Sequence, residues 1–341
     1  MNDKTREIIE TVRKSINKQY KDNVLFLGLD DMERTSIDVI PTGSLGLDTA
    51  MGVGGWPKGR IVEIYGEESS GKSTLVLTAI AQCQKMGGIA ALIDTEHSME
   101  WGYAEALGVN TNDLMISQPD YGEQALDVAD TLLKTSAVDL IALDSVAGLV
   151  PKAELEGDMG KAHVGLQARL MGQAMRKMAG VAHDVNTLLM FTNQTRFKVG
   201  ITYGSPITTP GGQALKFYAS VRVQVARIGM DKENGSGSVK VKVVKNKVAV
   251  PFKEAEFDLI WGKGIDSTGE IIDLAEKHGL VNLKGPWYIY KDYKIQGKDR
   301  FREMLLNNPQ ELGELTENTC KAISSMMIPT VQKAQESNEA E

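Results

Sequence analysis

Residues 66–73 read Gly-Glu-Glu-Ser-Ser-Gly-Lys-Ser and fit the pattern G-x-x-x-x-G-K-S/T of a phosphate-binding loop. Glycines let such a loop curl so that its backbone N–H groups point inward, and the helix that follows turns its positive end toward the phosphates. An apolar run at 60–65 precedes the loop, and helical spacing follows at 72–86. This order of strand, loop and helix predicts an α/β chain that binds a nucleoside triphosphate and hydrolyses it.

The loop supplies the first residues expected to hold the nucleotide. Lys72 is expected to reach the β- and γ-phosphates, and the Ser73 hydroxyl is expected to bind Mg²⁺. The residues of this segment expected to contact the nucleotide are Gly66, Glu67, Glu68, Ser69, Ser70, Gly71, Lys72, Ser73 and Thr74.

Short apolar runs and helical patterns alternate after the loop. The further apolar runs expected to be strands lie at 89–93, 114–117, 138–143 and 187–191. Helical spacing is found between them at 122–135 and 165–183. Such alternation predicts a mostly parallel sheet covered by helices on both faces. Two Val-rich alternating runs, 221–228 and 239–250, predict a hairpin.

The chain is expected to form one large α/β domain with smaller attachments. Residues 1–35 are expected to be an arm whose amphipathic helix, from 3 to about 21, docks on the main domain or on a neighbouring subunit. The nucleotide-binding core is expected to span 36–268, and a small α+β domain is expected at 269–330. Residues 331–341 are expected to be a short, acidic, disordered tail.

Composition and charge exclude some classes of protein. No run approaches the roughly 18 apolar residues of a transmembrane helix, and the first residues lack the apolar core of a signal peptide. We therefore expect a cytoplasmic protein without membrane contact. Cys83 and Cys320 lie far apart and are expected to be reduced structural thiols. The net charge of −7 conceals a basic stretch at 240–253, which contains lysines and no acidic residue.

Polar residues end several of the expected strands, at the sheet edge where parallel α/β proteins bind ligands. Asp144 follows a buried run and is expected to hold Mg²⁺ through water. Glu96 is expected to orient and deprotonate the attacking water, with Asp94 as the alternative. Gln194 is expected to detect the γ-phosphate.

Two segments near these strand ends suggest a nucleic-acid site. Segment 195–212 is long, irregular and rich in glycine and proline, which usually indicates a functional loop. It carries Arg196, Lys198 and aromatic residues, a mixture that suits single-stranded nucleic acid. A surface lid with incidental charges is an equally good interpretation of its composition. A second loop, near 156–165, precedes a helix on which Arg169 and Arg176 share a face.

Longer stretches of the chain resemble the bacterial RecA recombinases. Among them are Glu68-Ser-Ser-Gly-Lys72, Gln173-Ala-Met-Arg-Lys177 and Val243-Val-Lys-Asn-Lys247, and the resemblance runs from the N-terminal helix to about residue 305. It implies a RecA-like P-loop core with an N-terminal helix arm and a small C-terminal domain. It also implies an ATP- and Mg²⁺-dependent recombinase that forms filaments on single-stranded DNA, pairs it with homologous double-stranded DNA and exchanges strands in repair.

The resemblance implies roles for particular residues. Glu96 would be the catalytic carboxylate, Tyr103 would lie on the adenine, and Gln194 would couple ATP to DNA-binding loops near 157–164 and 195–209. Lys245 and Lys247 would reach the ATP of a neighbouring subunit. The residues expected at the DNA are Val164, Arg169, Arg176, Arg196, Lys198, Val199, Tyr203, Ile207, Gly211, Gly212 and Gln213. Lys216, Phe217 and Arg222 would lie near the interface between subunits.

Several positions depart from the family pattern. Glu67 stands where proline is usual, and Ser73 replaces threonine. Val164 and Ile207 stand where methionine and glutamate usually wedge between base triplets, and Gln213 replaces an asparagine. These departures suggest a divergent member, bacterial or phage-encoded. The short tail predicts weaker autoinhibition than is usual in the family, and the family implies single-strand-binding protein and an SOS-type repressor as further partners.

Three other functions share features with this sequence. A hexameric helicase or repair motor could use the same core, but no accessory domain is evident. A small-molecule kinase would need an arginine-rich lid over its acceptor, and none is found. A scaffold that binds ATP without hydrolysing it is disfavoured because Glu96 and Asp144 are both present.

Overall fold

The computed structural model describes residues 3–20, 25, 37–158, 165–197, 207–230 and 235–336, with side chains described as far as residue 323. The chain forms two compact units, Met1–Ile37 and Asp38–Glu341. The first contains α1 (Asp3–Tyr20), whose Asn17 side chain exchanges two hydrogen bonds with the backbone of Leu25. The second contains everything discussed below.

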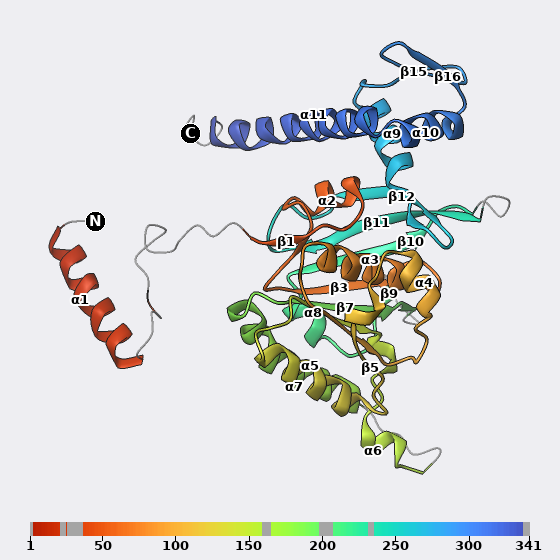
Figure 1. The fold of residues 1–341 in the computed structure, drawn as a ribbon. Helices are drawn as coiled ribbons and strands as arrows, with labels where there is room; N and C mark the ends of the chain where they lie inside the picture. Colours follow the sequence, from red (N-terminus) through yellow and green to blue (C-terminus); the bar gives the residue numbers. More distant parts are fainter. Residues whose placement is uncertain are drawn as a thin grey trace. The chain divides into compact units, whose positions relative to one another are not determined.

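A nine-stranded sheet in the order β13-β12-β11-β10-β3-β7-β6-β4-β5 forms the centre of the second unit (Figure 1). The strands that run parallel to one another are β3 (Ile61–Gly66), β4 (Ala90–Asp94), β5 (Met115–Ser117), β6 (Leu140–Asp144), β7 (Leu188–Gln194) and β10 (Val221–Arg227). The antiparallel strands are β11 (Ser236–Asn246), β12 (Glu254–Ile260) and β13 (Gly264–Ile265). The predicted mostly parallel sheet and the predicted hairpin are confirmed.

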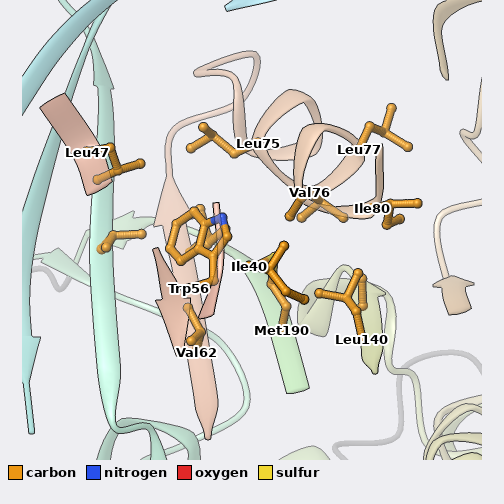
Figure 2. Close-up of a cluster of buried hydrophobic side chains, with 14 of the residues drawn as sticks. Ile40, Leu47, Trp56, Val62, Leu75, Val76, Leu77, Ile80, Leu140 and Met190 are labelled. Carbon is orange, nitrogen blue, oxygen red and sulfur yellow. The ribbon is translucent and has the colours of Figure 1, made fainter. Parts of the chain in front are cut away.

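Helices cover both faces of this sheet because its central strands are apolar on both sides. On one face, α3 (Lys72–Lys85) packs on a core that includes the fully buried Trp56, and Figure 2 shows its Ile80 directed toward Leu140 of the sheet. On the other face, α5 (Gly122–Lys134) and α7 (Leu166–Asp184) pack on a second core with Phe191. The successive residues Ile61 and Val62 of β3 enter opposite cores.

Shorter elements connect the strands and helices of this layer. The helical ones are α2 (Leu45–Met51), α4 (Trp101–Ala106), η1 (Thr111–Asp113), η2 (Val146–Gly148), α6 (Lys152–Leu155) and α8 (Ala214–Tyr218). The small antiparallel pairs are β1 (Val39–Ile40) with β2 (Trp56–Pro57), and β8 (Arg196–Phe197) with β9 (Ile207–Thr208). Within the residues described, no helix combines the length and the apolar character needed to cross a bilayer.

The C-terminal part has its own core. Its elements are α9 (Ser267–Lys277), β14 (Asn282–Lys284), β15 (Trp287–Tyr290), β16 (Tyr293–Gln296), α10 (Lys298–Asn307) and α11 (Pro309–Glu336). Tyr288 stacks on the fully buried Phe301, with 5.5 Å between the ring centroids. Glu270 of α9 accepts hydrogen bonds from the Ser44 hydroxyl and from the backbone of Leu45 and Gly46, which joins this part to the start of α2.

Three local expectations need correction. The Val-rich run expected to be a strand as far as 250 ends at Asn246, because the Asn246 side chain accepts the N–H groups of Val248 and Ala249 in a turn. Residues 331–336, expected in a disordered tail, are helical in α11, since Gln, Lys, Ala and Glu in this stretch favour helix. Segment 195–212 is not wholly irregular, because β8 and β9 pair at its base. The domain boundaries at 35/36, 268/269 and 330/331 stay predictions.

Candidate active site

The phosphate-binding loop connects β3 to α3 and has glycine where side chains cannot fit. Gly71 is the N-cap of α3 with a φ of +100°, and a Cβ there would lie 2.5 Å from Leu259 Cδ1. At Gly66 a Cβ would lie 2.2 Å from the carbonyl oxygen of Val225 on the neighbouring strand. The loop is thus held close to β10 and β12, with the N-terminus of α3 open toward it.

Lys72 is buried and folded into the loop. Its Nζ donates hydrogen bonds to the carbonyl oxygens of Gly66 at 3.2 Å and Glu67 at 2.6 Å. Burial lowers the pKa of Lys72, and the negative charges of Asp144 and Glu96 oppose that shift. The ammonium group therefore lies beside two carboxylates at the mouth of the loop. The Glu67 side chain is exposed to solvent, and the structure offers no account of why glutamate stands there.

Ser73 and Asp144 meet at the first turn of α3. The Ser73 hydroxyl donates to Asp144 Oδ2 at 2.7 Å, and the Thr192 hydroxyl donates to Asp144 Oδ1 at 2.5 Å. Burial raises the pKa of Asp144, while these two hydrogen bonds act in the opposite direction. A hydroxyl and a carboxylate oxygen converging on one point beside a phosphate loop are the ligand types that Mg²⁺ takes. The donor set fits that ion.

Glu96 lies just beyond β4, at the same edge of the sheet. Its Oε1 accepts a hydrogen bond from the Ser145 hydroxyl and lies 3.3 Å from Gln194 Nε2 at the end of β7. Glu96 is exposed, whereas Asp94 is 2% exposed.

Asp94 has a different environment. Its carboxylate accepts from the backbone N–H groups of Ser98 and Met99 and from the Gln118 side chain at 3.0 Å. These contacts occupy the Asp94 oxygens within the turn that follows β4. Of the two carboxylates that the sequence left as alternatives, Glu96 is the one available to a ligand.

A cavity of about 440 Å³ adjoins the loop. It is lined by the loop and the start of α3, by Tyr103, and by residues of β11 and β12 and their surroundings. The Tyr103 hydroxyl is hydrogen-bonded to the Thr74 hydroxyl at 2.8 Å, which brings α4 to the cavity. Its size lies in the usual range of small-molecule sites.

The cavity is also lined by residues that the sequence did not indicate, among them Arg227 and Trp261. Arg227, at the end of β10, donates a hydrogen bond to the carbonyl oxygen of Ser69, and Trp261, which follows β12, is 74% exposed at the rim. Neither belongs to a local motif. The pairing of β10 with β3 brings Arg227 to the loop, and the successive pairing of β12 with β11 and of β11 with β10 places Trp261 on the same side of the sheet order.

Lys245 and Lys247 do not contact the loop of their own chain. Lys245 Nζ donates to the carbonyl oxygens of Lys216 at 2.7 Å and Phe217 at 3.0 Å, and Lys247 Nζ donates to Phe217 O at 3.4 Å. These carbonyls belong to α8, which packs on the sheet face opposite α3. Burial lowers the pKa of Lys245, as do the positive charges of Lys247 and Arg222.

The expected DNA-contacting residues fall into two groups. The first group lies within the residues that the structure describes, on or near α7, β8, β9 and α8. Its side chains are exposed or half-buried, and it includes two glycines: Arg169, Arg176, Arg196, Ile207, Gly211, Gly212 and Gln213. The second group lies outside the described residues and consists of Val164, Lys198, Val199 and Tyr203. Of the expected loop at 157–164, the structure describes only 157 and 158.

Gly211 and Gly212 have a structural reason to be glycine. Both have positive φ, and a Cβ would lie 2.8 Å from Val146 Cγ1 at the first and 2.7 Å from Ala168 Cβ at the second. The Gln167 side chain accepts the Gly211 N–H at 3.2 Å. The end of segment 195–212 is therefore held tightly against α7 and η2.

Comparison with known proteins agrees with this geometry. The family model of the RecA N-terminal domain matches residues 7–266, and that of the RecA C-terminal domain matches 269–324. Protein RecA of Campylobacter jejuni subsp. doylei is 54% identical over 333 residues, which cover 96% of this chain and 95% of the relative. Protein RecA of Campylobacter hominis is 53% identical, with 92% of each chain covered.

A third relative extends the match beyond that genus. Protein RecA of Francisella philomiragia is 51% identical over 333 residues, covering 96% of this chain and 91% of the relative. Full-length matches at this level, together with a phosphate loop in the expected fold, leave one assignment: the chain belongs to the RecA family.

Proposed function

We propose that this chain is a DNA-dependent ATPase recombinase. In this proposal it binds ATP with Mg²⁺, assembles into a filament on single-stranded DNA and exchanges strands with homologous double-stranded DNA. Membership of the RecA family supports a recombinase function in general. The observation that carries the finer proposal is the position of Gln194, which lies 3.3 Å from Glu96 and immediately precedes the segment expected to grip DNA.

Hydrolysis would use residues that converge at the sheet edge. Glu96 would orient the attacking water and accept its proton, since an exposed carboxylate beside the loop can do both. Lys72 would leave the carbonyls of Gly66 and Glu67 to contact the β- and γ-phosphates. Ser73 and Asp144 would hold Mg²⁺, which would neutralise phosphate charge during transfer. Tyr103 would lie against the adenine at the cavity wall.

Gln194 would connect this chemistry to DNA. Its side-chain amide can donate to Glu96 or to a γ-phosphate oxygen, so bound ATP would compete with Glu96 for it. A shift at Gln194 would alter the segment that begins at residue 195. Arg169, Arg176 and Arg196 are exposed cations near that segment and would contact DNA phosphates.

Self-association would complete the active site. Lys245 and Lys247 lie across the sheet from α3, so we propose that they act on the ATP of a neighbouring subunit. The N-terminal helix would dock on that neighbour through its apolar face. Single-strand-binding protein and an SOS-type repressor would be further partners, as the family implies.

Two assays test this function. ATP hydrolysis by the full chain should be slow alone and rise strongly when single-stranded DNA is added. A strand-exchange assay should then give product with a homologous duplex and none with a non-homologous duplex. Equal ATPase rates with and without DNA would contradict the proposal, and unwinding that ignores homology would favour the helicase alternative.

A further inference from the structure

Glu63 is a fully buried carboxylate that the proposed mechanism does not use. It lies on β3, three positions before Gly66, and its side chain is 0% exposed. Its two oxygens have different partners: Oε1 accepts from Asn193 Nδ2 at 3.0 Å, and Oε2 accepts from Arg222 Nε at 2.5 Å. A buried charged group is stable only where it is paired and hydrogen-bonded, and Arg222 and Asn193 supply these two contacts to Glu63.

The Asn193 contact reaches both ends of segment 195–209. Asn193 is itself fully buried, and its Oδ1 accepts the backbone N–H of Gln194 at 3.0 Å. Its Nδ2 donates to Glu63 and also to the carbonyl oxygen of Pro210 at 3.2 Å. One side-chain amide therefore connects residue 194, before the segment, with residue 210, after it.

Glu63 fixes which way this amide points. An ionised carboxylate only accepts hydrogen bonds, so it requires the NH₂ group of Asn193 on its side. The amide oxygen is then left facing the N–H of Gln194. Were the amide turned over, the Asn193 oxygen would face Glu63 Oε1 and its NH₂ group would face the Gln194 N–H, and both contacts would be lost.

The Arg222 contact reaches the strand that carries the lysine pair. Arg222 is the register partner of Glu63 on one side and of Lys245 on the other. Its guanidinium also lies over the Tyr65 ring, 4.7 Å from the centroid. Lys245 in turn donates to the last carbonyls of α8, the helix that follows Gly212 and Gln213. Glu63 thus pairs with Arg222, one of the two cations whose charge acts on Lys245.

We propose that Glu63 is a positioning residue that couples Gln194 and Pro210 to Arg222 and the Lys245 strand, an inference that rests on the proposed function. When a γ-phosphate draws the Gln194 side chain from Glu96, the displacement of its backbone reaches Asn193. Because Asn193 holds Pro210 and Glu63 with the same amide nitrogen, both must respond. Binding of the γ-phosphate then alters both Pro210, at the C-terminal end of the DNA-binding segment, and the strand that carries Lys245 and precedes Lys247.

The test variant is Glu63→Gln, and the matched control is Glu270→Gln. Both remove one buried carboxylate that accepts hydrogen bonds, but Glu270 joins α9 to α2, away from this network. In Glu63→Gln, stimulation of ATP hydrolysis by single-stranded DNA should fall about tenfold, a usual size for coupling between sites. Nucleotide affinity without DNA should change no more than in the control.

A second readout separates coupling from mere stability. The ratio of the single-stranded DNA Kd with ADP to the Kd with a non-hydrolysable ATP analogue should fall toward one in Glu63→Gln and stay at the wild-type value in Glu270→Gln. Glu63→Asp keeps the charge, so its ratio should lie between that of Glu63→Gln and the wild-type value. If Glu63→Gln does not fold, Asn193→Ala keeps the Glu63–Arg222 ion pair, removes the three hydrogen bonds of the Asn193 amide and should lower the same ratio.

Each outcome of this experiment decides something. A wild-type ratio in a folded Glu63→Gln or Asn193→Ala protein would overturn the positioning role. An equal loss of nucleotide affinity and of DNA stimulation in Glu63→Gln would also overturn it, because that result indicates a structural role only. Absence of DNA stimulation in the wild-type chain would count against the proposed function itself, so the two failures are distinguishable.

Discussion

Gln194 Nε2 lies 3.3 Å from Glu96 Oε1, although 98 residues separate them in the chain. The ends of β4 and β7 lie at the same edge of the sheet, with β6 between them. The Glu96 carboxylate that would activate water is therefore hydrogen-bonded by the amide that would detect the γ-phosphate. This contact engages both groups with each other.

Replacing Glu96 with Gln should slow ATP hydrolysis without weakening nucleotide binding. The substitution removes the base and keeps the shape, so the DNA-stimulated rate should fall by roughly 10²–10⁴-fold, the usual contribution of a general base. Nucleotide affinity, measured by fluorescence titration, should stay within about twofold, since the phosphates are held by the loop. Asp94→Asn is the control: it should lower thermal stability through its three hydrogen bonds and leave Glu96-dependent chemistry in place. A larger rate loss in Asp94→Asn than in Glu96→Gln would reverse the assignment.

Arg196→Ala should reduce the salt dependence of single-stranded DNA binding. Arg196 is exposed on β8, at the base of the segment proposed to grip DNA. On single-stranded DNA, the loss of one phosphate contact per bound subunit lowers the slope of log Kd against log salt concentration by about 0.7. Lys321→Ala on α11 removes a charge paired with Glu317 and should leave the slope unchanged. Equal slopes for wild type and Arg196→Ala would remove Arg196 from the DNA site.

The sequence predicted the parts of this site that local patterns encode. The phosphate loop, the strand before it and the helix after it are contiguous, and periodicity placed Asp144, Glu96 and Gln194 at strand ends. Parallel strands bring such ends to one edge, so their meeting in space followed from the fold class. The choice between Glu96 and Asp94 did not follow, because it depends on where the turn after β4 places the N–H groups of Ser98 and Met99.

Contacts between distant strands could not be predicted in the same way. Glu63 meets Asn193 across 130 residues and Arg222 across 159, and a lone acidic residue in a strand pattern gives no sign of either partner. The lysine-rich run on β11 was visible, but its orientation toward α8 depends on the bulge between Arg222 and Val223 in the pairing of β10 with β11. Register of this kind arises from the assembled sheet rather than from any one segment.

Lys245→Ala should abolish DNA-stimulated hydrolysis and leave nucleotide binding by isolated monomers near normal. Lys245 donates to α8 of its own chain and does not contact its own phosphate loop, so its proposed effect on ATP requires a neighbour. Lys240→Ala, on the same strand but paired with Glu254 and Glu256, is the matched control and should retain stimulation. Weakened nucleotide binding in Lys245→Ala monomers would disprove a role between subunits.

The junction between α9 and α2 should make stability depend on pH. Burial raises the pKa of Glu270 from 4.5 to about 7, and the same cause raises the pKa of Asp48 to about 6. Between these pH values the folded chain keeps protons that the unfolded chain has released. The contribution of these carboxyl groups to the free energy of unfolding is therefore complete below about pH 4.5 and is lost as pH rises through about 7. For Glu270 alone the shift corresponds to about 3 kcal/mol.

Urea unfolding of wild type and Glu270→Gln between about pH 5 and pH 8 isolates this contribution. Asp48 and the remaining groups titrate in both proteins, so the informative quantity is the difference in unfolding free energy between them. As pH rises, the free energy of unfolding of Glu270→Gln should increase relative to that of the wild type. Only the wild type must then bury an added charge at the Ser44 hydroxyl and the N–H groups of Leu45 and Gly46. A difference that is constant with pH would mean that Glu270 is already ionised throughout this range, and that its three hydrogen bonds outweigh the effect of burial.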